Sequence, residues 1–124
     1  MNLFDSSALL CFLQGEPGSD VVESALERAD PVCSAVNWSE VAQKIIQHSR
    51  DWAAPEGLLR SYGVRVEPVL VDDAELAARL WRTGSGLSLA DRLCLATGRR
   101  LGATVWTADT AWGDGDGDGV RQIR

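Results

Sequence analysis

The chain opens with the stretch Asn2-Leu3-Phe4-Asp5-Ser6-Ser7-Ala8-Leu9-Leu10, in which three local signals follow one another. The apolar residues predict a short strand over Asn2–Phe4, and the Asp-Ser-Ser that follows is typical of a helix cap. Apolar residues then recur at helical spacing over Ala8–Leu13, until Gly15 and Pro17 stop the pattern. This stretch therefore predicts a strand, a cap and a helix, with an acid where the strand ends.

The same order of strand and helix repeats along the rest of the chain. Further strands are predicted over Val32–Val36, Gly63–Leu70, Ala103–Trp106 and Val120–Ile123. Helices are predicted over Ser19–Arg28, Asn37–Ile46, Asp72–Arg82 and Ser88–Leu101, with a short helical piece within Arg50–Tyr62. Pro68 makes the third strand an edge strand or ends it early. Strands separated by helices indicate a parallel sheet in an α/β domain.

Two predicted helices start with a capping residue followed three positions later by an acid. The pairs are Asn37 with Glu40 and Ser88 with Asp91. A carboxylate at this third helical position satisfies a free backbone N–H and meets the positive end of the helix dipole. The pattern therefore gives these two acids a purely structural explanation.

Length and composition limit the class of protein. A chain of 124 residues with 45% apolar content suits one domain, which we expect to span residues 1–124. The net charge of −6 argues against binding nucleic acid by bulk electrostatics, because phosphate binding draws on clustered Lys and Arg. A nucleic-acid substrate is still compatible with this charge, since a divalent metal and a local arginine face can reverse its sign.

The predicted location is the cytoplasm. Cys11, Cys33 and Cys94 are odd in number and lack a C-x-x-C pattern, so we expect buried, reduced thiols. The first residues lack the basic region of a secretory signal. No apolar run approaches the roughly 18 residues that a membrane span requires. We therefore expect a soluble protein with no membrane partner.

Four acids lie where an apolar run or turn meets a predicted helix. They are Asp5, Glu40, Asp91 and Asp109. The carboxyl ends of parallel strands meet along one edge of a sheet, so side chains that follow different strands gather in one crevice. Gathered carboxylates repel one another unless a cation lies between them. Capping explains each position separately, but not the choice of an acid at all four.

The segments around these acids resemble the four signature blocks of PIN-domain ribonucleases, and most closely those of the VapC-type toxins of bacterial type II toxin-antitoxin pairs. The blocks are Leu3–Leu10, Ser34–Val41, Leu87–Ala96 and Val105–Trp112. They occur in the family's order, and Val120–Arg124 resembles the family's closing strand. The resemblance therefore covers the chain from end to end.

This resemblance implies a three-layer α/β/α fold around a central parallel sheet of four to five strands. It also implies an Mg²⁺- or Mn²⁺-dependent endoribonuclease in which a metal-activated water attacks the phosphodiester and leaves 5′-phosphate and 3′-hydroxyl ends. The residues that match the family's site are the catalytic acids Asp5, Glu40, Asp91 and Asp109, of which Asp5, Asp91 and Asp109 hold the metal, and the supporting hydroxyls Ser7 and Thr107. The implied partners are an RNA substrate, a cognate antitoxin and a second copy of the chain.

The chain departs from the family after Trp112. Gly113–Gly119 alternates Gly and Asp and imitates the start of an EF-hand loop, but the chain ends before the bidentate Glu that such a loop needs. We expect a flexible acidic loop, in which Asp114 is open as an outer carboxylate. This departure leaves a second function open, a catalytically weakened PIN-like module for protein binding or regulation. A phosphatase or flap-type nuclease is disfavoured by the small size and the missing D-x-D motif.

Other polar and aromatic residues receive structural interpretations. His48 is the only histidine, and without a nucleophile motif we expect it on the surface. Trp81 and Trp106 lie in predicted core stripes. The arginines that flank the Asp91 helix are expected on a solvated face, with contact to substrate phosphates as the alternative. They are Arg82, Arg92, Arg99 and Arg100.

Overall fold

The computed structural model describes residues 1–28, 30–48, 50–113 and 119–124. Its strands form one sheet in the order β3-β2-β1-β4-β5, and every neighbouring pair is parallel. The strands are β1 (Asn2–Phe4), β2 (Pro31–Ser34), β3 (Arg65–Glu67), β4 (Thr104–Thr107) and β5 (Val120–Gln122). The predicted parallel sheet is confirmed, and β3 is an edge strand.

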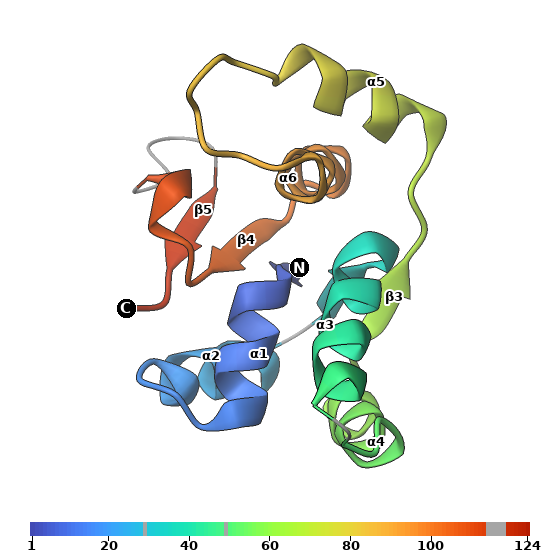
Figure 1. Ribbon diagram of the computed structural model, residues 1–124, viewed down its shortest axis with the longest axis vertical. Coiled ribbons are helices and arrows are strands. Elements are labelled where there is room, and N and C mark those ends of the chain that lie inside the picture. The colour runs from blue at the N-terminus through green and yellow to red at the C-terminus, as the bar shows by residue number, and fades with distance from the viewer. Residues whose placement is uncertain (29, 49, 114–118) are drawn as a thin grey trace.

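The helices cover both faces of this sheet. They are α1 (Ser6–Gln14), α2 (Ser19–Leu26), α3 (Ala35–Gln47), α4 (Ala53–Ser61), α5 (Val71–Arg79) and α6 (Leu89–Leu101), with a 3₁₀ turn, η1 (Thr110–Trp112). In Figure 1, α5 and α6 lie on one side of the sheet and α1 to α4 on the other. Within the described ranges, no helix is long and apolar enough to cross a membrane.

Alternate residues of the central strands face two separate core clusters. Phe4 and Cys33 pack with residues of α1 to α4. Their neighbours Leu3 and Val32 point the opposite way and pack with Cys94 of α6. Successive side chains of a strand lie on opposite faces, so a sheet with both faces covered is apolar along its whole length. The two clusters confirm the three-layer α/β/α arrangement.

The strand order places a topological switch point between β1 and β4. From β1 the chain proceeds through β2 to the edge at β3, and it then crosses to β4 on the other side of β1. Ligands of open parallel sheets bind outside the carboxyl ends of the strands at such a point. The residues that follow β1 and β4 are Asp5 and Ala108-Asp109.

Two predicted strand boundaries and one predicted cap are wrong. The apolar run Val32–Val36 stops being a strand at Ser34, because the Ser34 hydroxyl caps α3 by accepting the Asn37 N–H at 3.2 Å. Asn37 is therefore the third residue of α3 and not its cap. The predicted strand Gly63–Leu70 shortens to β3, since Leu70 already stands at the N-cap position of α5, where its N–H donates to Asp73.

The two tryptophans predicted in core stripes differ in the structure. Trp106 is partly buried and packs against the core under α1 and α2, which confirms the prediction. Trp81 is 58% exposed, so its prediction is wrong. The physical reason is that α5 ends at Arg79, with Leu80 as its C-cap, and the helical stripe does not continue to Trp81.

Two of the four arginines near Asp91 do not lie on a solvated face. Arg92 Nη1 donates to the carbonyl of Ala77 at 2.8 Å. Arg100 pairs with Asp73 at 2.8 Å and with Glu67 at 3.0 Å. These contacts join α6 to α5 and β3, and they correct the sequence interpretation. Arg82 and Arg99 are exposed.

Gly98→Ala is expected to destabilise the fold, because α6 passes close to the sheet at this residue. An added Cβ would lie 2.5 Å from Val105 Cγ2 and 3.5 Å from Leu3 Cδ2. Overpacking of this kind costs about 1–3 kcal/mol, of which the better helix propensity of Ala offsets about 1 kcal/mol. Urea unfolding should show the net loss. Gly57→Ala in α4 is the matched control, since nothing lies within 4 Å of its Cβ, and a loss of the same size there would contradict the packing argument.

Candidate active site

Asp5 is the buried centre of the candidate site. It follows β1, is 2% exposed, and caps α1 by accepting the Ala8 N–H on Oδ1 at 2.8 Å. Ser7 Oγ donates to the same oxygen at 2.7 Å, and Thr107 Oγ1 donates to Oδ2 at 2.5 Å. Both carboxylate oxygens are therefore fixed, one from α1 and the other from β4.

The two hydroxyl groups connect Asp5 to the segment after β4. Ser7 Oγ lies 3.2 Å from Thr107 Oγ1 and accepts the Ala108 N–H at 2.9 Å. Thr107 Oγ1 accepts the Asp109 N–H at 3.0 Å. The residues predicted as supporting hydroxyls thus link the backbone on both sides of the switch point.

Asp109 leaves β4 in the predicted capping position. Its Oδ1 accepts the Ala111 N–H at 2.9 Å, which makes it the N-cap of η1. Gln122 of β5 donates through Nε2 to the carbonyls of Asp109 at 2.9 Å and Gly113 at 2.8 Å. The neighbouring strand therefore holds the main chain on either side of η1.

Glu40 is positioned by a buried polar pair that sequence reasoning missed. Ser34 and Asn37 are both 0% exposed. Ser34 Oγ donates to Asn37 Oδ1 at 2.9 Å, and Asn37 Nδ2 donates to Glu40 Oε1 at 2.8 Å. The sequence does hold a signal for this chain of bonds, since Ser34 and Asn37 have the three-residue spacing of a cap and its partner. The apolar run into Val36 conceals it.

Asp91 has the capping geometry that the sequence predicts. Its Oδ2 accepts the Ser88 N–H at 2.9 Å, while Ser88 Oγ accepts the Asp91 N–H at 3.1 Å. The carboxylate is half-buried at the start of α6. A capping role and a site role are compatible, because a helix N-terminus can fix the direction of a carboxylate.

The four acids share one electrostatic environment. Burial raises the pKa of Asp5 to about 6, although hydrogen bonds from Thr107, Ser7 and Ala8 lower it, and the charge of Asp91 raises it further. Burial likewise raises the pKa of Asp91 above its usual value. Hydrogen bonds from Ser88 oppose that rise, and the charges of Asp109 and Glu40 add to it. The fold thus brings together acids that are far apart in the sequence.

The nearby cysteines confirm the prediction of free, buried thiols and sense the same charges. Cys11, Cys33 and Cys94 are unpaired and buried. Burial raises the pKa of the Cys33 thiol, and the charges of Asp5 and Glu40 add to the rise. Burial also raises the pKa of Cys94, with Asp5, Asp91 and Glu40 among the charges that add to it. Both thiols remain protonated at neutral pH and are poor metal ligands.

The donor set of this site fits a hard cation. It consists of carboxylate and hydroxyl oxygens, which Mg²⁺ and Mn²⁺ prefer. In the part of the chain that the structure describes, no three His, Cys, Asp or Glu side chains are grouped closely enough to hold a metal ion. Mg²⁺ usually keeps several waters and takes one or two protein carboxylates directly, so neighbouring acids that do not converge on one point remain compatible with it.

Of the predicted acidic loop Gly113–Gly119, residues 114–118 lie outside the described residues, and Asp114 is one of them. His48 is exposed, as predicted, at the C-cap of α3, where its Nδ1 lies 2.8 Å from the carbonyl of Lys44.

Asp5→Asn is expected to stabilise the metal-free protein more at neutral than at acidic pH. The folded-state pKa of Asp5, about 6, exceeds the usual 3.8, so between these pH values the folded state binds more protons than the unfolded state. The stability of the parent protein therefore falls as the pH rises through this range. The difference amounts to about 3 kcal/mol, at 1.36 kcal/mol per pKa unit. Asn does not titrate. Urea unfolding of both proteins with EDTA, from about pH 4 to about pH 7, measures the difference. A difference that does not change with pH would contradict the raised pKa.

Comparison with known proteins identifies the family. The profile of the PIN domain family matches residues 3–117. The chain is 33% identical to ribonuclease VapC42 of Mycobacterium tuberculosis over 110 residues, which cover 81% of this chain and 84% of that protein.

Two solved structures share the fold. A toxin-antitoxin complex from Klebsiella pneumoniae superposes with a TM-score of 0.75 at 25% identity, over 100% of this chain and 98% of that one. VapC20 of Mycobacterium tuberculosis, a sarcin-ricin loop cleaving toxin, superposes with a TM-score of 0.66 at 20% identity, over 87% and 88% of the two chains. The resemblance in the sequence is therefore confirmed, and this chain belongs to the PIN-domain family and, within it, to the VapC-type ribonucleases.

Proposed function

We propose that this chain is a metal-dependent endoribonuclease that acts as the toxin of a type II toxin-antitoxin pair. The observation that carries the proposal is the buried Asp5 carboxyl, whose raised pKa reflects burial and the charge of Asp91 at the sheet's switch point. A cation would offset this accumulated charge. Membership of the VapC-type ribonucleases supports RNA as the substrate.

In this proposal, Asp5, Asp91 and Asp109 hold Mg²⁺ or Mn²⁺, and Glu40 completes the catalytic acids. A bound ion of this kind lowers the pKa of a coordinated water and offsets the charge that develops on the phosphate. The Ser7 and Thr107 hydroxyls keep both oxygens of Asp5 in one orientation.

Glu40 takes the proton of the attacking water in this scheme. The Asn37 amide holds Oε1 of Glu40, which directs the carboxylate from α3. A general base has to be fixed within hydrogen-bond reach of the proton it accepts. Hydrolysis then leaves a 5′-phosphate and a 3′-hydroxyl end.

The proposed protein partner is an antitoxin. The structure from Klebsiella pneumoniae, which covers this whole chain, is a toxin-antitoxin complex. A basic side chain of the antitoxin would be attracted to the carboxylates and would form charge-assisted hydrogen bonds there. The proposal also includes a homodimer and a cytoplasmic location.

One observation favours a second candidate function, a catalytically weakened PIN-like module that binds proteins. Among the described residues, the acids do not form a group of three that could hold a metal ion as they stand. A module of this kind would bind the antitoxin and would not cleave RNA at any metal concentration.

Removal of divalent metal is expected to abolish RNA cleavage by the purified protein. Single-stranded RNA should be cut in Mn²⁺ or Mg²⁺, should remain intact in EDTA, and should be cut again when metal is restored. Ca²⁺ serves as a control for simple charge neutralisation, because it is larger and binds in a looser geometry. Cleavage that continues in EDTA would contradict metal dependence, and no cleavage with any metal would favour the binding module. Growth arrest on expression that is relieved by co-expression of a small protein encoded next to this one tests the toxin role.

A further inference from the structure

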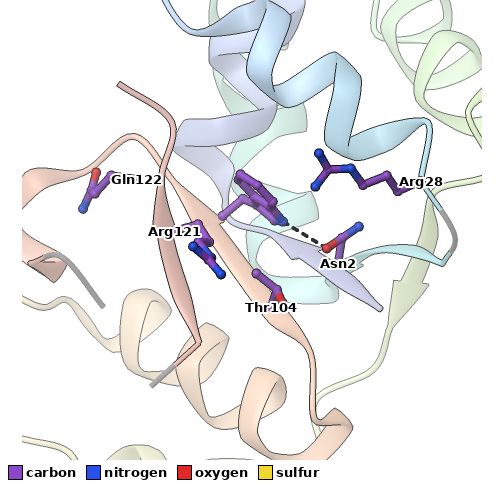
Figure 2. Close-up of a pocket in the computed structure, with 6 residues that line it drawn as sticks. Asn2, Arg28, Thr104, Arg121 and Gln122 are labelled. Carbon is purple, nitrogen blue, oxygen red and sulfur yellow. Dashed lines mark hydrogen bonds between the residues drawn. The ribbon is translucent and has the colours of Figure 1, made fainter. Parts of the chain in front are cut away.

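A cavity of about 450 Å³ lies on the sheet face that packs against α2, and nothing in the proposed reaction uses it. The described residues that line it are Asn2, Arg28, Thr104, Trp106, Arg121 and Gln122. Figure 2 shows Arg28, just beyond α2, and Arg121, on β5, approaching Asn2 and Thr104 from opposite sides.

The floor of this cavity is fixed by hydrogen bonds. Trp106 Nε1 donates to Asn2 Oδ1 at 3.1 Å, and Asn2 Nδ2 donates to the carbonyl of Ala25 in α2 at 3.3 Å. Trp106 is only partly buried. The indole is therefore held in one orientation, while part of it stays accessible from the cavity.

The walls of the cavity carry a local positive charge on an acidic protein. Arg28 and Arg121 are both exposed, and neither forms an ion pair within the described ranges. The described lining residues include no carboxylate. Two guanidinium groups that face one cavity form an anion site, because each can donate two parallel hydrogen bonds to a phosphate.

The structure points to a nucleoside phosphate as the ligand of this cavity. Guanidinium groups bind the phosphate, an accessible aromatic surface stacks on a base, and amide and hydroxyl groups hydrogen-bond to base edges or sugar. Arg28 and Arg121 supply the first, Trp106 the second, and the Thr104 hydroxyl the third, since the Gln122 amide already donates to Asp109 and Gly113. An acidic peptide would use the arginines but would leave the indole without a role.

The place of the cavity makes substrate RNA the favoured source of this nucleotide, an inference that rests on the proposed ribonuclease function. Thr104 lines the cavity, and Thr107 at the other end of β4 bonds to Asp5. These two residues lie about 10 Å apart, at a strand rise of about 3.3 Å per residue. Their side chains face opposite sides of the sheet, so an RNA strand that reaches both sites would pass around the edge strand β5. In the absence of metal the carboxylates of the site repel phosphate, whereas the arginines of the cavity attract it. We therefore expect the cavity to bind RNA in metal-free protein.

The test measures binding without cleavage, in an Asp5→Asn background with EDTA. Fluorescence anisotropy with a short single-stranded RNA compares Arg28→Gln/Arg121→Gln with the control pair Arg60→Gln/Arg79→Gln, which removes the same charge from exposed sites outside the cavity. We expect the Arg28→Gln/Arg121→Gln change, the cavity pair, to weaken RNA binding at least about tenfold more than the control pair does. The slope of log K against log salt should fall in magnitude by about 1.4, since each of the two arginines that no longer neutralises a phosphate lowers it by about 0.7. Thermal unfolding checks that both variants are folded.

Two further arms separate the sources of the ligand. In the first arm, calorimetry measures binding of adenosine 5′-monophosphate. If the Arg28→Gln/Arg121→Gln protein alone loses this binding, and RNA affinity does not depend on the two arginines, the ligand is a free nucleotide. Equal RNA affinity of the two variant pairs, without nucleotide binding, would overturn the inference. Loss of affinity for polyglutamate in the cavity pair, with affinity for RNA retained, would also overturn the inference, since the cavity would then bind acidic peptides. These results do not depend on cleavage, so the proposed function can fail while RNA binding at the cavity stands.

Discussion

Asp5→Asn is expected to lower metal-dependent RNA cleavage by about 10²- to 10³-fold while the protein stays folded. The loss corresponds to several kcal/mol of charge stabilisation by a metal site, at 1.36 kcal/mol for each tenfold change in rate. Asn retains an oxygen that can accept the Ala8 N–H and the Ser7 hydroxyl, and its amide can donate to Thr107. The substitution therefore removes the charge and keeps the shape.

The control for this prediction is Asp20→Asn, which removes the same charge from an exposed position in the first turn of α2. Initial rates of cleavage at saturating Mn²⁺ measure both variants. We expect Asp20→Asn to cleave within about twofold of the parent, because Asp20 is exposed, lies outside the candidate site, and its charge is screened by salt. An Asp5→Asn protein as active as this control would exclude Asp5 from the catalytic site.

The part of the site that can be predicted from sequence depends on local signals. The sequence correctly places Asp5 as the cap of α1 and Asp91 at the third position of α6 after the cap Ser88, because the spacing between a capping side chain and the N–H it accepts is fixed within one turn. The parallel sheet follows from strands separated by helices. Together these signals are sufficient to put Asp5 and Asp109, which follow β1 and β4, at one sheet edge. Whether the acids act as metal ligands is still a prediction.

The parts that cannot be predicted depend on contacts between distant segments. The sequence favours a solvated face for Arg100, but Glu67 and Asp73 lie 33 and 27 residues earlier in the chain, and no local pattern links them to it. Trp81 is predicted in the core only if α5 continues beyond its true end at Arg79. The predicted cap of α3 is misplaced because β-branched Val32 and Val36 favour a longer strand than the Ser34 hydroxyl permits.

Arg100→Met is the second change with a large expected effect, a loss of about 3 kcal/mol in the free energy of unfolding at neutral pH. Arg100 donates to both oxygens of Asp73, which is 1% exposed, and to Glu67. Burial alone would raise the pKa of Asp73, and the hydrogen bonds and charge of Arg100 lower it below its usual value. Met fills much of the volume of the Arg stem but leaves a buried carboxylate without its partner.

The loss should shrink at acidic pH. The lowered pKa of Asp73 stabilises the folded state at pH values above 3.8, the pKa of the unfolded state. That stabilisation disappears as the pH falls through the folded-state pKa. Once Asp73 is protonated, Arg100 has little charge left to compensate there. Urea unfolding of parent and variant at about pH 7 and about pH 3 measures the two differences. Arg60→Met is the control, because Arg60 and Glu56 form a more exposed pair at 3.6 Å, worth about 0–1 kcal/mol.

A double variant separates the unpaired charge from lost packing. Adding Asp73→Asn to Arg100→Met removes the buried charge, and the amide oxygen can still accept the Leu70 N–H that caps α5. If the unpaired carboxylate causes most of the loss, the double variant should recover about half of it or more, since breaking a buried pair costs more than replacing the whole pair. No recovery would mean that the Arg100 stem stabilises the α5 and α6 packing through its apolar contacts. In that case the ion pair itself contributes little to stability.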